Sequence, residues 1–216
     1  MSDLRIIVGA GAQGRVILET WRAQQPNARF VFLDDNAALH GTRILDAEVV
    51  GGVDQAASLG GEVILALGHN EKRLALAKKL AGARFGNAIH PSAIVMPSAT
   101  IGAGTVVFPG AIVQTEARIG EHVIVNTGVI IEHDAKVGDG ASISPGTKSG
   151  GRIVIGEGAF IATGVTLAPR VSIGAWSVIG AGSVVVSNIR DRTLAYGVPA
   201  RAVGKIDETF DWQRLL

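Results

Sequence analysis

Apolar residues recur at every sixth position through the second half of the chain. From Ile89 to Val185, sixteen of the seventeen positions with this spacing carry Ile, Val or Leu, and the position four residues after each carries Ala, Val, Ile, Thr or Ser. The frame never slips. A constant six-residue period is typical of a parallel β-helix, in which each hexad forms one short strand and a turn. Three hexads then close a triangular coil of about 18 residues, and the coils stack roughly 4.8 Å apart.

The first half has a different rhythm, in which short apolar runs alternate with stretches of helical periodicity. The runs predict strands and the intervening stretches predict helices, with Asn70 as the N-cap of the second helix. Continuous apolar strands separated by helices predict a small parallel sheet covered on both faces. The expected strands are Arg5–Val8, Arg29–Leu33 and Glu62–Leu67, and the expected helices are Gln13–Gln24 and Asn70–Leu80.

This change of rhythm indicates two domains. We predict a Rossmann-like parallel-sheet domain over residues 1–86 and a parallel β-helix over residues 87–216, with a C-terminal tail after the last hexad. The fold class is therefore α/β plus all-β. The aliphatic column can hold the β-helix together, because burial of each such side chain stabilises the fold by roughly 1.5–3 kcal/mol.

Composition and charge exclude several classes of protein. Lys plus Arg number 20 and Asp plus Glu number 19, so the net charge of +1 gives no reason to expect nucleic acid as a partner. The absence of cysteine excludes disulfides, thiolate metal sites and a cysteine nucleophile. No stretch approaches the roughly 18 apolar residues of a membrane span, and the N-terminal segment does not have the form of a signal peptide. We therefore expect a soluble cytoplasmic protein.

One hexad interrupts the aliphatic column, and it lies one coil beyond the charged segment IEHD. Ser149 stands where an aliphatic residue is expected, and Gly150 and Gly151 follow it without a change of frame. His133, in the charged segment, lies 18 residues before Gly151 and so at the same corner of the preceding coil. Glycines at this point indicate either a local bend or the close approach of another group to the backbone.

This pairing of residues suits acyl transfer. A neutral imidazole can take a proton from an attacking amine or hydroxyl, which contributes roughly 10²–10⁴-fold to the rate. Asp134 and Glu132 are both candidates to orient the ring of His133. The Gly151 N–H can donate to a thioester oxygen as it becomes an oxyanion, which is worth about 10²–10³-fold. The alternatives are a solvated surface histidine and a metal site; no second histidine lies one coil away at this corner, so we expect no metal ligands.

A glycine-rich turn, GAGAQG at residues 9–14, follows the first expected strand and precedes the first expected helix. Asp34 lies twenty residues past Gly14, at the end of the second strand. This spacing is the dinucleotide fingerprint, so an NAD-dependent oxidoreductase is one hypothesis. The first domain is short for that fold and a β-helix follows it, which favours another phosphate-bearing ligand at the helix N-terminus. A tight strand–helix turn without a ligand is the third interpretation.

Taken together, the motifs resemble one known family over essentially the whole chain. They are GAGAQG, FLDD, ALGHNEKR, IHPSA, the hexapeptide repeat, NTGVIIEHD and YGVPAR. Their order and content are similar to the bacterial nucleotide-amino-sugar N-acetyltransferases of the NeuD/PglD type, which are related to sialic acid O-acetyltransferases. The resemblance implies a left-handed β-helix, a homotrimer, acetyl-CoA lying along the β-helix between neighbouring subunits, and a nucleotide sugar held mainly by the N-terminal domain.

The resemblance also implies roles for individual residues. It makes His133 the general base, Asp134 its partner, and the Gly151 amide the group that faces the thioester oxygen. Family members often carry His where this chain has Gln13, which can donate and accept a hydrogen bond but cannot ionise. The positions that match nucleotide-sugar contacts are Gly11, Ala12, Gln13, Asp34, Asp35 and Leu67, and those that match CoA contacts are Ser142, Thr163 and Ala181.

The expected reaction is acetyl-CoA-dependent N-acetylation of a 4-amino-4,6-dideoxyhexose linked to UDP or GDP, by direct transfer in a ternary complex. Its expected setting is the biosynthesis of bacterial surface glycans such as the O-antigen of lipopolysaccharide. O-acetylation of a sugar is the alternative within the same class, because the same base can serve a hydroxyl. From other classes, an NAD-dependent oxidoreductase and a non-catalytic β-helix scaffold remain as hypotheses.

Overall fold

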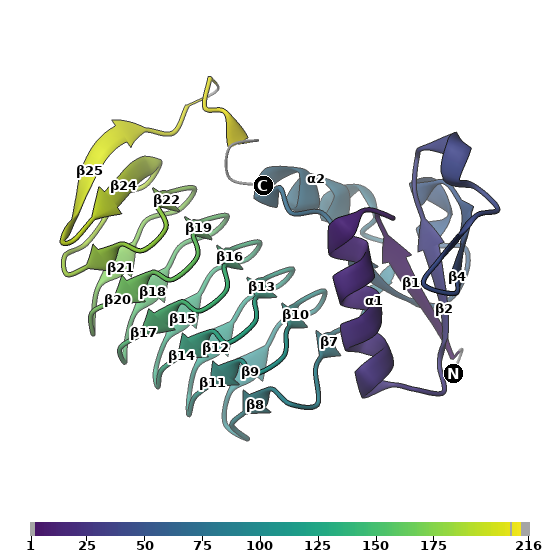
Figure 1. Cartoon of the computed structure of the whole chain (residues 1–216), viewed down its shortest axis with the longest axis horizontal. Coiled ribbons are helices and arrows are strands. Elements are labelled where there is room, and N and C mark those ends of the chain that lie inside the picture. The colour runs from purple at the N-terminus through teal and green to yellow at the C-terminus, as the bar shows by residue number, and fades with distance from the viewer. Residues whose placement is uncertain (1–2, 208, 213–216) are drawn as a thin grey trace.

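The computed structural model describes residues 3–207 and 209–212. Figure 1 shows an α/β part that lies beside one end of a long β-helix, with the C-terminal segment crossing back toward helix α2. None of the helices among the described residues is long and apolar enough to cross a membrane.

The N-terminal part is a six-stranded sheet in the order β3-β4-β2-β1-β5-β6, parallel except for the edge strand β3. Adjacent residues of β1 face opposite sides: Ile7 packs in one buried cluster with residues of α1, and Ile6 packs in another with Ala77 of α2. The predicted parallel sheet with both faces covered is therefore confirmed. The elements are β1 (Leu4–Val8), α1 (Ala12–Gln24), β2 (Arg29–Leu33), η1 (Ala37–Leu39), β3 (Arg43–Ile44), β4 (Ala47–Gly51), η2 (Val53–Ala56), β5 (Glu62–Leu65), α2 (Asn70–Lys79) and β6 (Arg84–Phe85).

The predicted N-cap of α2 is wrong. His69 is the cap, and its Nδ1 accepts a hydrogen bond from the Lys72 N–H at 3.4 Å. The Asn70 side chain turns instead to the β-helix, where its amide donates to the main-chain oxygens of Gly158 and Ala159. Local sequence preference predicts that Asn70 caps the helix, but its side chain bonds to the β-helix instead.

The β-helix has three faces, each a ladder of parallel two-residue strands. Residues 18 apart pair across successive coils, as in Val107 with Val125. Face 1 holds β7 (Ala88–Ile89), β10 (Val106–Val107), β13 (Ile124–Val125), β16 (Ser142–Ile143), β19 (Phe160–Ile161) and β22 (Val178–Ile179), and it ends in β24 (Thr193–Gly197) and β25 (Ala200–Lys205). Face 2 holds β8 (Ile94–Val95), β11 (Ile112–Val113), β14 (Ile130–Ile131), β17 (Lys148–Ser149), β20 (Thr166–Leu167) and β23 (Val184–Val185). Face 3 holds β9 (Thr100–Ile101), β12 (Arg118–Ile119), β15 (Lys136–Val137), β18 (Val154–Ile155) and β21 (Ser172–Ile173).

The hexad positions explain this core. The aliphatic column and the small residues beside it form one continuous buried cluster along the β-helix axis. Side chains of α1, such as Ile17 and Trp21, pack in a second cluster together with outward-facing residues of face 1, such as Val106 and Ile124. Face 1 is therefore the side of the β-helix on which the N-terminal domain sits.

Arg73 of α2 joins the two parts of the chain from inside their interface. It is 1% exposed, and its guanidinium donates to the main-chain oxygens of Leu67, His122 and Gly140, among other acceptors. Burial lowers the pKa of Arg73 to about 9, so the group stays charged at neutral pH. Within the part of the chain that the structure describes, no carboxylate forms an ion pair with Arg73. Main-chain carbonyls hold this charge, and they fix the end of β5 against the β-helix.

Candidate active site

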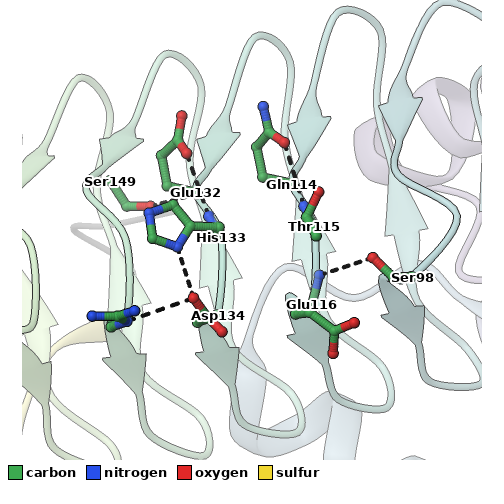
Figure 2. Close-up of polar contacts among 9 residues, drawn as sticks. Ser98, Gln114, Thr115, Glu116, Glu132, His133, Asp134 and Ser149 are labelled. Carbon is green, nitrogen blue, oxygen red and sulfur yellow. Dashed lines mark hydrogen bonds and ion pairs between the residues drawn. The ribbon is translucent and has the colours of Figure 1, made fainter.

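His133 lies at the corner where the chain passes from face 2 to face 3, directly after β14. Figure 2 shows its imidazole beside Asp134, next to the coil that carries Ser149. The main-chain oxygen of His133 accepts a hydrogen bond from the Arg152 N–H at 2.8 Å. This bond fixes the corner of one coil against the corner of the next.

The imidazole of His133 packs directly against the backbone of Gly151. A Cβ atom built on Gly151 would lie within 2.6 Å of the ring atom Cε1 and closer still to Nε2. No side chain fits in that space, so glycine is required by the approach of the ring. The 18-residue offset predicted this proximity, and the structure shows it.

Asp134 is the carboxylate that orients the ring. Its Oδ2 lies 2.7 Å from Nδ1 of His133 and 3.6 Å from Nε of Arg152. The hydrogen bond from His133, followed by the nearby charge of Arg152, holds the pKa of Asp134 below its usual value. An ionised carboxylate only accepts hydrogen bonds, so the proton of the neutral ring sits on Nδ1 and the lone pair on Nε2. Glu132 contacts only the main chain of His133, because its Oε2 accepts the His133 N–H at 3.4 Å.

The N–H of Gly151 has no acceptor among the described residues, and the neighbouring coils show why. At this corner, the side chain of the preceding residue accepts the main-chain N–H: Gln114 caps Thr115, as Glu132 caps His133. Gly150 has no side chain with which to cap Gly151. A residue with a Cβ does not fit at position 150, since that atom would lie 2.6 Å from the ring of Pro169. The free donor of Gly151 thus results from the glycine at position 150.

Two carboxylates that follow β2 bind main-chain N–H groups at and near the glycine-rich turn. Asp34 accepts the Ala10 N–H at Oδ2 (2.8 Å) and the Asn36 N–H at Oδ1 (2.9 Å). Asp35 accepts the Val53 N–H at 3.0 Å. Oδ2 of Asp34 therefore holds the glycine-rich turn through Ala10, and Oδ1 holds the loop that follows β2.

A cavity of about 410 Å³ lies between this turn and face 1 of the β-helix. Its volume is in the usual range for a small-molecule site. The Nε2 of Gln13 is buried and has no hydrogen-bond partner in the described part of the chain. The lining residues are Ala12, Gln13 and Gly68 from the N-terminal domain, and Ile124, Asn126, Ser142, Ile143, Ser144, Pro145, Phe160 and Thr163 from the β-helix.

Among the other residues expected in the site, Ser142 and Thr163 line this cavity, whereas Gly11, Leu67 and Ala181 are not part of its lining. Gly11 is exposed at the turn, and the Leu67 oxygen accepts from Arg73 at the end of β5. Ser142 lines the cavity but is 5% exposed, and its hydroxyl donates to Asn70 Oδ1 at 2.6 Å. Thr163 also lines the cavity, and Ala181 is exposed one coil beyond it.

His133 does not lie in this cavity. The cavity opens on face 1, whereas His133 stands at the corner between faces 2 and 3, across the β-helix. One chain therefore carries the two halves of the expected site on different sides.

Several residues at or near the cavity are not among those expected from the sequence. Arg73 gives no local signal, because a buried arginine without an acidic partner fits no common pattern. Asn126 and Ser144 line the cavity from the corner between faces 1 and 2. The repeat frame could have found them, since Asn126 and Ser144 are 18 residues apart and both are polar.

Comparisons with known proteins agree with this fold. A model of the PglD N-terminal domain matches residues 6–80, and a model of the bacterial transferase hexapeptide matches residues 152–187. A mutant of perosamine N-acetyltransferase from Caulobacter crescentus, solved in complex with CoA and GDP-perosamine, is 34% identical with a TM-score of 0.85, over 93% of this chain and 97% of that one. The chain belongs to the NeuD/PglD-type acetyltransferase family.

Two further solved structures are similar over nearly the whole chain. The acetyltransferase domain of PglB from Neisseria gonorrhoeae, in complex with acetyl coenzyme A, is 33% identical with a TM-score of 0.89, over 94% of this chain and 100% of that one. WeeI from Acinetobacter baumannii, at 24% identity and a TM-score of 0.81 over 93% and 99% of the two chains, shares the fold. No curated protein sequence gives a significant match. The expected fold of a NeuD/PglD-type chain, a small parallel-sheet domain followed by a left-handed β-helix, is confirmed.

We expect Gly151→Ala to abolish most turnover while the protein stays folded. The new methyl group must displace the His133 ring, because its position lies within 2.6 Å of Cε1. Gly82→Ala is the matched control, since a Cβ there meets nothing within 4 Å. Steady-state rates and thermal unfolding of both variants measure this; full activity in Gly151→Ala would show that the ring and the glycine backbone do not act together.

Proposed function

We propose that this protein transfers the acetyl group of acetyl-CoA to the amino group of a 4-amino-4,6-dideoxyhexose linked to UDP or GDP, in bacterial surface-glycan biosynthesis. The observation that carries the proposal is the arrangement at the corner of face 2 and face 3. The His133 ring is oriented by Asp134 at 2.7 Å and lies against Gly151, whose N–H has no acceptor in the described part of the chain. Membership in the NeuD/PglD-type family supports the reaction class.

The proposed chemistry is a direct transfer in a ternary complex. The sugar amine attacks the thioester carbonyl carbon, and Nε2 of His133 takes the proton that the nitrogen loses. The Gly151 N–H donates to the carbonyl oxygen as it becomes negative, which stabilises the tetrahedral intermediate. The C–S bond then breaks, and CoA leaves as its thiol after taking the proton from the imidazolium. Asp134 stabilises the transient positive charge on the ring.

The nucleotide sugar is proposed to bind at the glycine-rich turn. The N-terminus of α1 begins at Ala12 there, and helix N-termini favour phosphate groups. The unpartnered Nε2 of Gln13 supplies a neutral donor where many family members carry histidine. Gly11, Asp34, Asp35 and Leu67 complete the proposed binding surface, and Ser142, Thr163 and Ala181 are the proposed CoA contacts.

We propose a homotrimer in which each active site forms between subunits. Within one chain, the cavity at Gln13 and the ring of His133 lie on different sides of the β-helix. A neighbouring subunit that presents its corner of faces 2 and 3 to this cavity brings the two together. A closed ring of identical subunits repeats that contact at every interface.

His133→Asn and His133→Ala should lower kcat by roughly 10²–10⁴-fold with little effect on CoA binding, because only the base is removed. His90→Asn is the matched control, since His90 is also on the β-helix and its Nδ1 pairs with Ser92. Turnover is followed by CoA release, and CoA affinity by calorimetry. Near-normal kcat in the His133 variants would exclude His133 as the general base.

A competition assay separates N-acetylation from O-acetylation. It presents amine and hydroxyl acceptors of the same sugar nucleotide together and measures which one is acetylated.

Mixed trimers test whether the site is shared. Gly11→Asp places a negative charge at the turn, where a Cβ meets nothing within 4 Å, so the variant should fold but repel a diphosphate. Coexpression of Gly11→Asp with His133→Ala should restore about a quarter of wild-type turnover, because a quarter of random interfaces join two intact halves. Activity no higher than that of the separate variants would place both halves of the site in one chain. Coexpression of two differently tagged His133→Ala chains is the control.

A further inference from the structure

The one break in the aliphatic column lies beside the proposed active site. Ser149 occupies the column position between Ile131, 1% exposed, and Leu167, 2% exposed. It pairs normally with Leu167 in the next coil. Fewer residues pair with the preceding coil. β14 and β17 pair only at Ile130 with Lys148, whereas β11 and β14 pair at two positions. The irregularity is thus confined to the step between the coil of His133 and the coil of Gly151.

The Ser149 side chain takes over the missing contact. On the other coils of face 2, the residue after each strand donates its N–H to the main-chain oxygen of the column residue one coil on, as Gln114 does to Ile131 at 2.9 Å. The equivalent N–H of Glu132 donates instead to the Ser149 hydroxyl oxygen, at 3.1 Å. Figure 2 shows this bond immediately before His133.

We propose that Ser149 is a positioning residue for the proposed acetyl transfer. Its hydroxyl replaces a main-chain rung of the ladder and so sets the separation between the backbone of Glu132–His133 and that of Gly150–Gly151. The base and the free N–H come from these two adjacent segments. The hydrogen bonds that flank them are Glu132 N–H to the Ser149 hydroxyl and Arg152 N–H to the His133 oxygen. An aliphatic residue would fill the core better, so the serine gives up burial at the one step where spacing governs chemistry.

The matched variants are Ser149→Thr, which keeps the hydroxyl, and Ser149→Val, which has the same shape as threonine without it. We expect Ser149→Thr to keep kcat within about threefold. We expect Ser149→Val to lower kcat by about tenfold to 100-fold, since displacement of reacting groups by about 1 Å has effects of this size. The KM values should change less than kcat, and the Tm of Ser149→Val should equal or exceed that of the wild type. A purely structural role for Ser149 would leave kcat unchanged in any variant that stays folded.

Crystal structures of the two variants provide a readout that does not depend on the reaction. In Ser149→Val, the Glu132 N–H should bond to the main-chain oxygen of residue 149 and Gly151 should move relative to the His133 ring; Ser149→Thr should keep both contacts. An unmoved backbone in Ser149→Val, wild-type kcat in that variant, or equal loss of kcat in both variants would each overturn the inference. If the proposed function itself is wrong, substitution of His133 will leave the turnover of the wild-type protein unchanged.

Discussion

The main-chain hydrogen bonds between successive coils are the interaction on which this structure depends. They place each residue over the one 18 positions earlier, so two distant points in the sequence become neighbours with a fixed separation. His133 and Gly151 are such a pair, and the proposed transfer depends on this register because the amine and the carbonyl group that they would contact react with each other. The aliphatic column supplies the stability that holds the ladder rigid. Precise placement on rigid elements is what the proposed catalytic role of this pair requires.

The corner between faces 2 and 3 departs from the repeat in ways that all bear on the same two residues. Glycine at 151 leaves room for the imidazole, and glycine at 150 provides no side chain to accept the Gly151 N–H, which has no acceptor among residues 3–207 and 209–212. Ser149 then replaces a rung of the ladder with a side-chain bond. On the opposite side of the β-helix, Arg73 fixes the N-terminal domain over face 1 through main-chain carbonyls. The chain thus carries the proposed base at one edge of the β-helix and the cavity at another face, which suits the proposed assembly in which neighbours complete each other's sites.

Sequence patterns predicted what depends on periodicity and left undetermined what depends on side-chain direction. The hexad frame placed His133 beside Gly151, because a constant period leaves only one register. It left both Asp134 and Glu132 as candidates to orient the ring, since both flank the histidine, and only the family resemblance favoured Asp134. In the structure the Asp134 backbone has φ +58° and its carboxylate lies at Nδ1 of the ring. The cap of α2 was assigned to Asn70 and is His69, because the β-helix provides Asn70 with better partners. No local pattern signals Arg73, whose partners are carbonyls from several separate segments.

The most direct test of the proposed transfer is a crystal structure with the nucleotide-linked amino sugar and an unreactive acetyl-CoA analogue, in which a methylene group replaces the thioester sulfur. We expect the Gly151 nitrogen within hydrogen-bond distance, about 2.7–3.2 Å, of the carbonyl oxygen of the analogue. We also expect Nε2 of His133 within about 2.6–3.2 Å of the sugar amine, with the sugar nucleotide held by a neighbouring subunit. An analogue whose carbonyl binds away from Gly151, or a sugar amine out of reach of every His133 in the assembly, would contradict it.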